Sequence, residues 1–221
     1  GYHKLVPKMP IETITLPSLN KEWYARDVVR EVMLSAGFSD VYTYGFNNIG
    51  EIEVANPIAA DKKFLRNNLM GGLKVAALEN LKYENEVRIF EFGHVFGKTD
   101  GKIREESSFA AIVGFQKRKE LQMKGDFYAL KGVLETVFTT LGIKGTRYEE
   151  AGGELIASVY AGNDLLGTMS LNGFELDFTK MVTLSDAEVA YAVPSRFPSI
   201  IRDVSLFVPM STNAGDVPAI I

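Results

Sequence analysis

The strongest candidate for a catalytic or ligand-binding residue in this sequence is an arginine. Arg66 stands in the stretch "KKFLRNNLMGG", directly ahead of an apolar pattern with helical spacing. A guanidinium is always charged and bonds a carboxylate or a phosphate through two parallel hydrogen bonds. Two roles are therefore open for Arg66: a clamp for an anionic substrate, or a structural contact with a carboxylate or a backbone group.

The two histidines, His3 and His94, lack the neighbours that a catalytic or zinc site needs. Neither has a second histidine or a carboxylate at the spacing of zinc ligands. His94 follows Glu91 and Gly93 and is expected to be an ordinary residue near the end of a strand. The sequence also has no phosphate-binding glycine loop, no dinucleotide fingerprint and no nucleophile elbow. We therefore assign no catalytic, cofactor-binding or metal-binding residue.

The composition excludes several classes of protein. Of the 221 residues, 46% are hydrophobic and 24% are charged, which is typical of a globular domain with a sizeable core. The absence of cysteine excludes a disulfide framework, thiolate catalysis and a cysteine-ligated metal, and it favours a cytoplasmic location. No apolar run is long enough to span a membrane.

The net charge argues against a dedicated nucleic-acid-binding protein. It is −4, whereas such proteins carry a basic face that neutralises phosphates. The chain has two small basic clusters, Lys62-Lys63 and Lys117-Arg118-Lys119. We expect both clusters to be solvated loops.

The first predicted helix follows a linker. Residues 1–18 hold three prolines and no period, so they are expected to be irregular. A helix is predicted from about Lys21 to Ala36, with Ser18 as its N-cap and Gly37 just past its end. Its apolar residues recur at helical spacing and form one stripe, made of Ala25, Val28, Val29, Val32, Met33 and Ala36.

The next two elements flank Arg66. The stretch "VYTYGF" (41–46) is aromatic and β-branched, which predicts a strand. Asn67 or Asn68 is then expected to cap a second helix, in which Gly71-Gly72 is tolerated for close packing or for an irregular start. One side of that helix is apolar and carries Leu69, Leu73, Ala76, Ala77 and Leu81.

A hairpin and a longer helix follow. Strands are predicted over 87–92 and 108–115, joined as an antiparallel hairpin by the long polar loop "GKTDGKIREESS". A helix is predicted over 126–142, with Asp126 as its cap and Gly142 at its end. Its apolar stripe consists of Phe127, Leu130, Leu134, Val137, Phe138 and Leu141.

The last part of the chain is predicted to be rich in strands. Residues 154–162, 164–171 and 188–193 alternate or run apolar, with a hairpin turn signal at 162–164. A separate strand is predicted over about 203–208. Because the strands cluster and do not alternate strictly with helices, the predicted fold class is α+β, with an antiparallel sheet flanked by helices.

Five segments, in order along the chain, resemble the β subunit of bacterial phenylalanyl-tRNA synthetase. The family patterns are a Gly-Tyr-Asp-Lys-Ile-Pro-Pro end, an Asn-Pro…Leu-Arg-x-x-Leu-x-x-Gly-Leu run, a Phe-Glu-x-Gly-x-Val-Phe strand, a Phe-x-x-Leu-Lys-Gly helix start and a Phe-Pro-x-x-x-Arg-Asp strand. Each match alone is weak, and it is the order of all five across nearly the whole length that indicates the family. The matching segments are "GYHKLVPKMP" (1–10), "NPIAADKKFLRNNLMGGLKVAALENL" (56–81), "VRIFEFGHVF" (87–96), "DFYALKGVLETVF" (126–138) and "RFPSIIRDVSLFV" (196–208).

The resemblance implies how the chain is divided. Residues 1–15 would be a linker and the end of a winged-helix-like domain, and residues 16–193 a domain that resembles the class II synthetase core. Residues 194–221 would be the truncated start of a ferredoxin-like anticodon-binding domain. We expect the chain to be an excerpt from a longer polypeptide, with the family's editing domains and magnesium-binding carboxylates upstream. No metal is therefore assigned within it.

The sequence departs from the family pattern at two places. The family often has a His-Pro-Gly-Arg segment before its late strands, whereas residues 151–167 read "AGGELIASVYAGNDLLG". The family's Gly-Glu-x-His-Pro turn is replaced by Ser170-Leu171-Asn172-Gly173. We expect the surface built there to differ from that of the family.

The resemblance also implies where a catalytic core would hold ATP. Class II synthetases stabilise the phosphate charge with arginines, one in a Phe-Arg-x-Glu hairpin strand and another after a glycine-rich strand. The matching hairpin strand here reads Phe90-Glu91-Phe92-Gly93, and no arginine lies between Arg147 and Arg196. Since a carboxylate repels triphosphate, we predict a synthetase fold that has lost ATP chemistry. Glu91 and Arg66 are then expected to be structural.

The function implied by the resemblance is that of a scaffold. The β subunit holds the catalytic α subunit in an (αβ)₂ phenylalanine–tRNA ligase, which uses ATP and magnesium to attach phenylalanine to its tRNA; no cofactor is expected in this chain. The first class II motif forms the subunit interface and matches residues 21–46, so Trp23, Tyr24 and Val28 are predicted to face partner helices. The alternatives are a tRNA-binding module that uses 194–221 and the loop at 116–119, and an active stand-alone ligase, against which the missing arginines argue.

Overall fold

A computed structural model of the chain describes residues 2–9, 16–116, 120–153, 155–186, 193–198, 200–210 and 212; for the helical residues 120–125 it describes the backbone only. Contacts between residues divide the chain into two units, Gly1–Glu188 and Val189–Ile221. The helices and strands of the described residues all lie in the first unit, beginning with a short 3₁₀ helix, Tyr2–Lys4. None of the helices described is long and apolar enough to cross a membrane.

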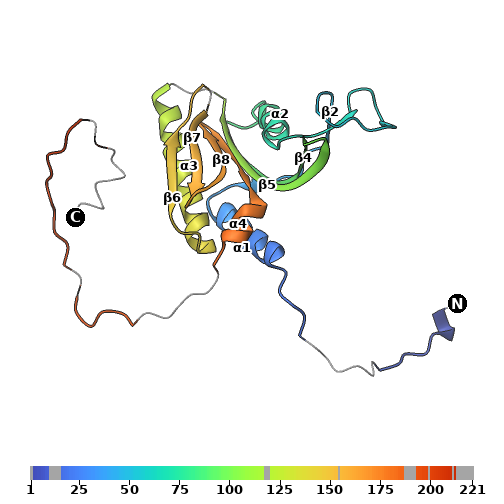
Figure 1. The fold of residues 1–221 in the computed structure, drawn as a ribbon, viewed down its shortest axis with the longest axis horizontal. Coiled ribbons are helices and arrows are strands. Elements are labelled where there is room, and N and C mark those ends of the chain that lie inside the picture. The colour runs from blue at the N-terminus through green and yellow to red at the C-terminus, as the bar shows by residue number, and fades with distance from the viewer. Residues whose placement is uncertain are drawn as a thin grey trace. The chain divides into compact units, whose positions relative to one another are not determined.

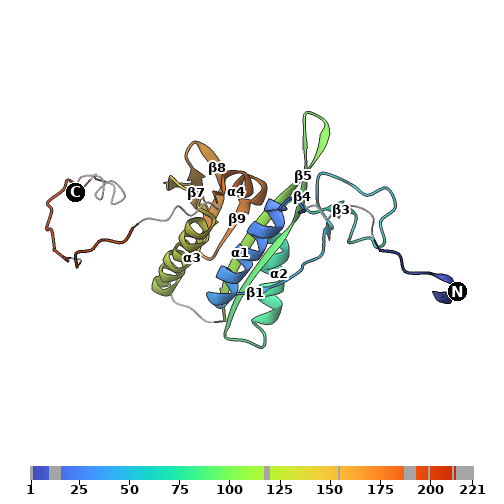
Figure 2. The same cartoon turned by 90° about the horizontal axis from the view of Figure 1, so that it is seen from below.

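The first unit is built on a seven-stranded sheet (Figure 1, Figure 2). Its strands are β1 (Ser39–Asp40), β4 (Glu86–Thr99), β5 (Lys102–Phe115), β6 (Thr146–Glu150), β7 (Leu155–Ala161), β8 (Asp164–Ser170) and β9 (Gly173–Asp177). Their spatial order is β1-β4-β5-β9-β8-β7-β6, and every neighbouring pair is antiparallel except the parallel edge pair β1–β4. The predicted α+β class is confirmed, with one parallel edge strand added.

Helices flank both faces of the sheet, as predicted (Figure 1). The α1 face is covered by α1 (Lys21–Ser35), α3 (Glu120–Leu141) and α4 (Phe178–Leu184), and the α2 face by α2 (Met70–Asn80). A large apolar core lies on the α1 face and contains a cluster of phenylalanines: Phe90, Phe92, Phe109, Phe174 and Phe178. A smaller core lies under α2 and consists of Leu69, Leu73, Ala77, Val87, Ile89, Ala110 and Ile112.

Helix α1 buries the predicted stripe but begins with a different cap. Ala25, Val29 and Met33 are buried, and the other stripe residues pack partly against the same core. The cap is Asn20, whose Oδ1 accepts hydrogen bonds from the backbone N–H groups of residues 22 and 23 at 3.1 and 3.2 Å. The prediction of Ser18 was wrong because Asn20, directly before the first helical residue, satisfies these otherwise unpaired donors. Gly37 follows the helix with φ 82°, as predicted.

The long polar loop predicted between the two central strands is wrong. Residues 97–99 and 102–108 continue the strands, so β4 and β5 pair along their full length from Glu86↔Phe115 to Thr99↔Lys102. The turn is Asp100-Gly101, with φ 51° and 75°. Positive φ at both central positions is what a two-residue type I′ hairpin turn requires, and its twist matches that of the flanking strands.

The strand predicted over 41–46 is wrong for most of its length. Only Phe46 belongs to a strand, β2 (Phe46–Asn47), which pairs with β3 (Phe64–Leu65) in a separate two-stranded sheet. After Val41, whose N–H bonds the carbonyl of Phe90, the chain leaves the sheet edge. It leaves because Thr43 forms side-chain hydrogen bonds on the α2 face, which a regular edge strand would prevent.

Helix α3 is longer than predicted. It begins at residue 120 and not at Asp126, which lies within the helix. Five of its six extra residues, Glu-Leu-Gln-Met-Lys, have high helix propensity and outweigh the unfavourable Gly125, so no cap is needed at 126. The predicted stripe is buried from Leu130 onward, and Gly142 ends the helix with φ 70°.

The late strands were predicted in part. β7, β8 and the turn at Gly162-Asn163 are confirmed, whereas the short elements β6, β9 and α4 were missed. The predicted strand at 188–193 lies outside the described residues, apart from Val193, which belongs to no strand. The short elements escaped prediction because five to seven residues show too little periodicity to distinguish them from loops.

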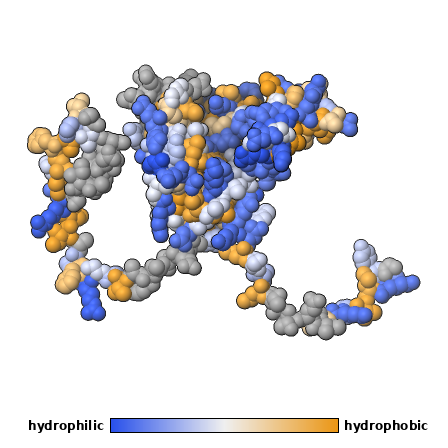
Figure 3. Space-filling model, viewed as in Figure 1, coloured by the Kyte–Doolittle hydropathy of each residue, from blue (hydrophilic) through white to orange (hydrophobic). Residues whose placement is uncertain are grey.

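The described part of the second unit is irregular and exposes many apolar side chains, with polar ones between them (Figure 3). The strand predicted over 203–208 is wrong, since those residues contain no strand. A strand exists only where its backbone groups pair with a neighbour, and an apolar pattern alone does not supply one. The large apolar side chains that are most exposed here are Phe197, Ile200, Ile201, Phe207 and Met210.

Replacing the cap of α1 should lower the stability of the first unit. We expect Asn20→Ala to reduce the free energy of unfolding by about 1 kcal/mol, because two N–H donors at the helix start lose their acceptor. Urea unfolding followed by circular dichroism measures the change. Ser18→Ala is the matched control and should leave the midpoint unchanged; equal effects of the two substitutions would contradict the assignment of Asn20.

Candidate functional site

Two carboxylates lie in one row across the α2 face of the sheet. Glu91 on β4 is directly opposite Ala110 on β5, which in turn is opposite Glu175 on β9. Glu91 is fully buried. A buried carboxylate is costly unless it is paired and hydrogen-bonded. The partners of Glu91 and Glu175 therefore decide whether this face of the sheet can bind a ligand or serves only to hold the protein together.

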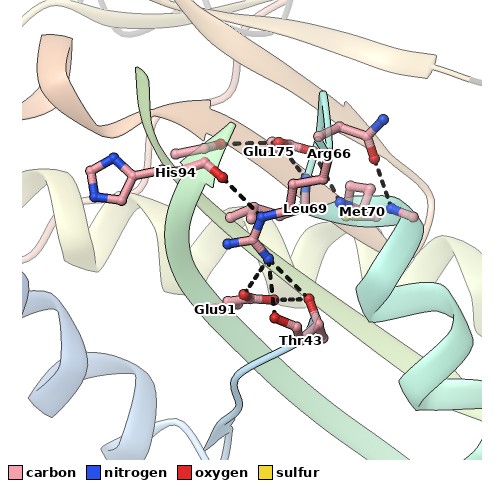
Figure 4. Close-up of polar contacts among 10 residues, drawn as sticks. Thr43, Arg66, Leu69, Met70, Glu91, His94 and Glu175 are labelled. Carbon is pink, nitrogen blue, oxygen red and sulfur yellow. Dashed lines mark hydrogen bonds and ion pairs between the residues drawn. The ribbon is translucent and has the colours of Figure 1, made fainter. Parts of the chain in front are cut away.

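Glu91 is paired with Arg66 inside the protein (Figure 4). Arg66 Nη1 lies 2.7 Å from Glu91 Oε1, and the Arg66 side chain is only 6% exposed. Thr43 Oγ1 donates to Glu91 Oε2 at 2.6 Å and accepts from Arg66 Nη1 at 3.1 Å. Arg66 Nε donates to the carbonyl oxygen of His94 at 2.9 Å. The structural role predicted for Arg66 is thereby confirmed, because its donors are used by a carboxylate, a hydroxyl and a backbone carbonyl.

Gly93 is what allows Arg66 to reach this position. The guanidinium crosses β4 directly above Gly93, where a methyl group would collide with Arg66 Nη2. Gly72 likewise leaves space for Thr43, because a Cβ at position 72 would lie 2.5 Å from Thr43 Oγ1. Of the two reasons offered for the Gly71-Gly72 pair, close packing therefore applies to Gly72. The glycine that replaces the glutamate of the catalytic pattern makes room for Arg66.

Glu175 caps helix α2 from across the sheet (Figure 4). Its Oε1 accepts from the N–H of Leu69 at 2.8 Å and from Ser108 Oγ at 3.0 Å, and its Oε2 accepts from the N–H of Met70 at 3.1 Å. Asn68 Oδ1, one of the two predicted caps, accepts from the N–H of residue 71 at 2.8 Å. A carboxylate at this end is favoured by the partial positive charge of a helix N-terminus.

The two carboxylates together hold residues 43–70, which we call the strap, against the sheet. Glu91 binds the strap at Thr43 and Arg66, and Glu175 binds it at its last two residues. The sheet surface between the two carboxylates is covered by the start of α2. Leu69, directly before the helix, and Ala110 on β5 are both fully buried in the smaller core. This region of the α2 face is therefore part of the protein interior.

The charged groups of this site are paired with one another and with neighbouring protein groups. The buried cation, Arg66, has its charge neutralised by Glu91 at 2.7 Å. β9 and α4 carry no arginine, and their Lys180 lies 3.5 Å from Asp177 and donates to the carbonyl of Leu165. Across the described ranges, no group of three or more histidine, aspartate or glutamate side chains could hold a metal ion.

The other predicted residues lie away from this network. Trp23 and Tyr24 are 59% and 46% exposed on α1, whereas Val28 packs partly against the large core. His94 contributes its carbonyl to Arg66, and its exposed ring lies 3.3 Å from Glu105. The cluster at 117–119 lies outside the described residues.

Thr43, Ser108 and Glu175 are the members of the network that sequence reasoning missed. Thr43 sits in an aromatic stretch that predicted a strand, and Glu175 in a short segment that predicted nothing. No spacing relates either residue to Arg66 or Glu91, because the four belong to elements that meet only through the sheet. A family alignment of paired positions is the signal that could have found them.

One perturbed side chain lies on the opposite face. Burial, with the neighbouring Glu135 carboxylate, raises the pKa of Tyr148 far above its ordinary value. Tyr148 on β6 packs against the large core, and Lys131 Nζ sits 4.3 Å from its ring centre. The hydroxyl therefore stays neutral, as part of the packing between β6 and α3.

Solved structures identify the class of fold. A crystal structure of pyrrolysyl-tRNA synthetase from Desulfitobacterium hafniense superposes on 73% of this chain and 68% of its own, with a TM-score of 0.57 and 15% identity. A second structure of that enzyme gives a TM-score of 0.54. The chain has the fold of a class II aminoacyl-tRNA synthetase core.

Sequence comparison narrows the class to one family. The family model described as the phenylalanyl tRNA synthetase beta chain CLM domain matches residues 5–170, and the chain belongs to this family. The phenylalanine–tRNA ligase beta subunits of Geobacter sulfurreducens and Thermotoga maritima are 25% and 26% identical to it, over 98% and 95% of the chain. The match covers 32% and 31% of those proteins, so the chain spans about a third of their length.

Removing only one partner of the buried ion pair should be strongly destabilising. We expect Arg66→Met to lower the free energy of unfolding by about 3–5 kcal/mol, because Glu91 is left as an uncompensated buried charge. The double variant Arg66→Met/Glu91→Met should recover most of that loss. Urea unfolding measures both values.

The exposed pair Lys82–Glu79, with side chains 58% and 62% exposed, provides the control. Lys82→Met should change stability by less than about 1 kcal/mol, since solvent screens the pair. If Arg66→Met were as mild as Lys82→Met, the central place of the buried pair would be disproved.

Proposed function

We propose that this chain is the non-catalytic synthetase-like core of a phenylalanine–tRNA ligase beta subunit, which holds the catalytic α subunit in an (αβ)₂ enzyme. The observation that carries the proposal is the buried Arg66–Glu91 pair. Glu91 stands on the hairpin strand where a catalytic core needs an arginine, and Arg66, the one buried cation among the described side chains, is already neutralised. Family membership supports the same conclusion, because the matching relatives are beta subunits.

Electrostatics supports the loss of ATP chemistry. A triphosphate needs cations placed where its charge develops, whereas Glu91 and Glu175 put two carboxylates in one row on this face. The strap occupies the space above them through contacts of 2.6 to 3.1 Å. To bind a nucleotide between the two carboxylates, the protein would have to break these contacts and expose two buried or half-buried charges.

Helix α1 supports the scaffolding role. Trp23 is 59% exposed, although tryptophan is usually well covered in a monomer. Its ring lies 5.7 Å from the guanidinium carbon of Arg26, which itself sits 5.0 Å above the ring of Phe92. Trp23 is thus exposed at the outer end of a cation–π stack on the core, and tryptophan is enriched among interface hot spots.

The remaining features of the proposal concern the whole enzyme. ATP, magnesium and tRNA would be bound by other parts of the complex, in the cytoplasm, and the product would be phenylalanine attached to its tRNA. The boundaries proposed within the chain are 1–15 for the end of a preceding domain, 16–193 for the synthetase-like core and 194–221 for the start of the next domain.

The chain alone should not activate phenylalanine. When it is mixed with phenylalanine, ATP and magnesium, we expect no exchange of labelled pyrophosphate above buffer, because Arg66 is already paired with Glu91 and the carboxylates of this face repel a triphosphate. The complete ligase from the same source is the positive control. Robust exchange by the chain would refute the loss of catalysis.

The chain should bind the cognate α subunit through α1. We expect the two proteins to co-elute in size-exclusion chromatography, and Trp23→Glu to weaken association at least tenfold by titration calorimetry, because a buried hot-spot aromatic contributes about 2 kcal/mol or more. Tyr83→Glu, at an 86% exposed aromatic beyond α2, is the matched control and should bind like the unaltered chain. Binding of tRNA by the chain without any binding of the α subunit would favour the tRNA-binding alternative.

A further inference from the structure

A pocket of about 490 Å³ lies on the α2 face beside the strap, over β8 and β9. Its size falls in the range of small-molecule sites. One wall comes from α2 with Met70 and Lys74, and the floor from the two strands with Thr168 and Gly173. The rim includes the Ser170–Gly173 turn, at which the sequence departs from the family pattern.

The polar groups left open in this pocket are hydrogen-bond donors. Glu175 is a pocket-lining acceptor, but its two oxygens already take three hydrogen bonds. Ser170 Oγ donates to Asn172 Oδ1 at 3.3 Å, which leaves the Asn172 amide nitrogen as the open group of that side chain. Within the described ranges, Lys74 Nζ and Thr168 Oγ1 have no hydrogen-bond or ion-pair partner. Thr168 is directly opposite Glu175 across the β8–β9 ladder and therefore shares its face of the sheet.

This set of donors defines the charge of a ligand. One ammonium group, one amide and one hydroxyl suit a singly charged acceptor group, and all three can donate to its oxygens. A phosphate dianion would meet a single cation with the Glu175 carboxylate close by, which opposes the second charge. A carboxylate matches the site.

The rest of the lining defines the body of the ligand. Met70 and Leu155 contribute apolar surface, and methionine adapts its shape to different apolar groups. We propose that this pocket binds a small organic carboxylate with an apolar body, its carboxylate on Lys74, Asn172 and Thr168. The pocket borders the network at Glu175 and Met70 but includes neither Arg66 nor Glu91. It does not depend on the proposed scaffolding function, since it needs neither ATP chemistry nor the α subunit.

Hexanoate and hexanamide are suitable probes, because they share an apolar chain and differ in charge. Titration of each into the ¹⁵N-labelled 221-residue chain, followed by amide chemical shifts, should give hexanoate the tighter dissociation constant by about tenfold, the difference expected for a charge-assisted contact. The shifts should concentrate at residues 70–75 and 168–175. Lys74→Gln should weaken hexanoate binding about tenfold and leave hexanamide unchanged.

Lys82→Gln is the matched control, since this exposed lysine is ion-paired with Glu79 and does not line the pocket. It should bind hexanoate as the unaltered chain does. A tripeptide Gly-Gly-Leu and its C-terminal amide separate two sources of the same chemistry: binding of the free-acid peptide extends the site to peptide C-termini, and binding of hexanoate alone restricts it to small acids. Equal binding of acid and amide, shifts outside the pocket, or no effect of Lys74→Gln would overturn the proposal.

Discussion

The rest of the first unit depends on the burial of one carboxylate. Glu91 is fully buried, and an ionised carboxylate in that environment must be paired and hydrogen-bonded at both oxygens. Arg66 and Thr43 meet that requirement with contacts of 2.7 and 2.6 Å. Because the two partners precede Glu91 by 25 and 48 residues along the chain, the pairing of one buried carboxylate determines the path of a long segment.

Several apparently separate features follow from this demand. The chain leaves the sheet edge after Val41 so that Thr43 can reach the α2 face. Gly93 is needed because Arg66 lies directly above it, and Gly72 because Thr43 lies directly against it. Glu175 then fixes the other end of the strap by capping α2. The α2-face surface between Glu91 and Glu175 is thereby part of the protein interior, whereas α1 keeps an aromatic surface exposed.

The sequence predicted the helices better than their ends, and the strands better than their connections. The stripes of α1 and α3 were correct because burial of one helical face imposes a period that a sequence displays directly. The predictions of the α1 cap, the start of α3 and the central hairpin turn were wrong. Each of these features depends on only one or two residues, and other residues close by in the sequence were plausible alternatives. β6, β9 and α4 were missed because they are short.

By itself the sequence predicted the class of fold and the family, and it favoured a structural role for Arg66 and the loss of ATP chemistry. These follow from residue types and their order along the chain. Only the tertiary structure decided that Thr43 and Glu175 join Arg66 and Glu91, that the strap covers the sheet, and that a donor-lined pocket remains beside it. The physical reason is that buried charges and helix ends choose partners by proximity in space, and β4, β5 and β9 bring together residues up to 106 positions apart.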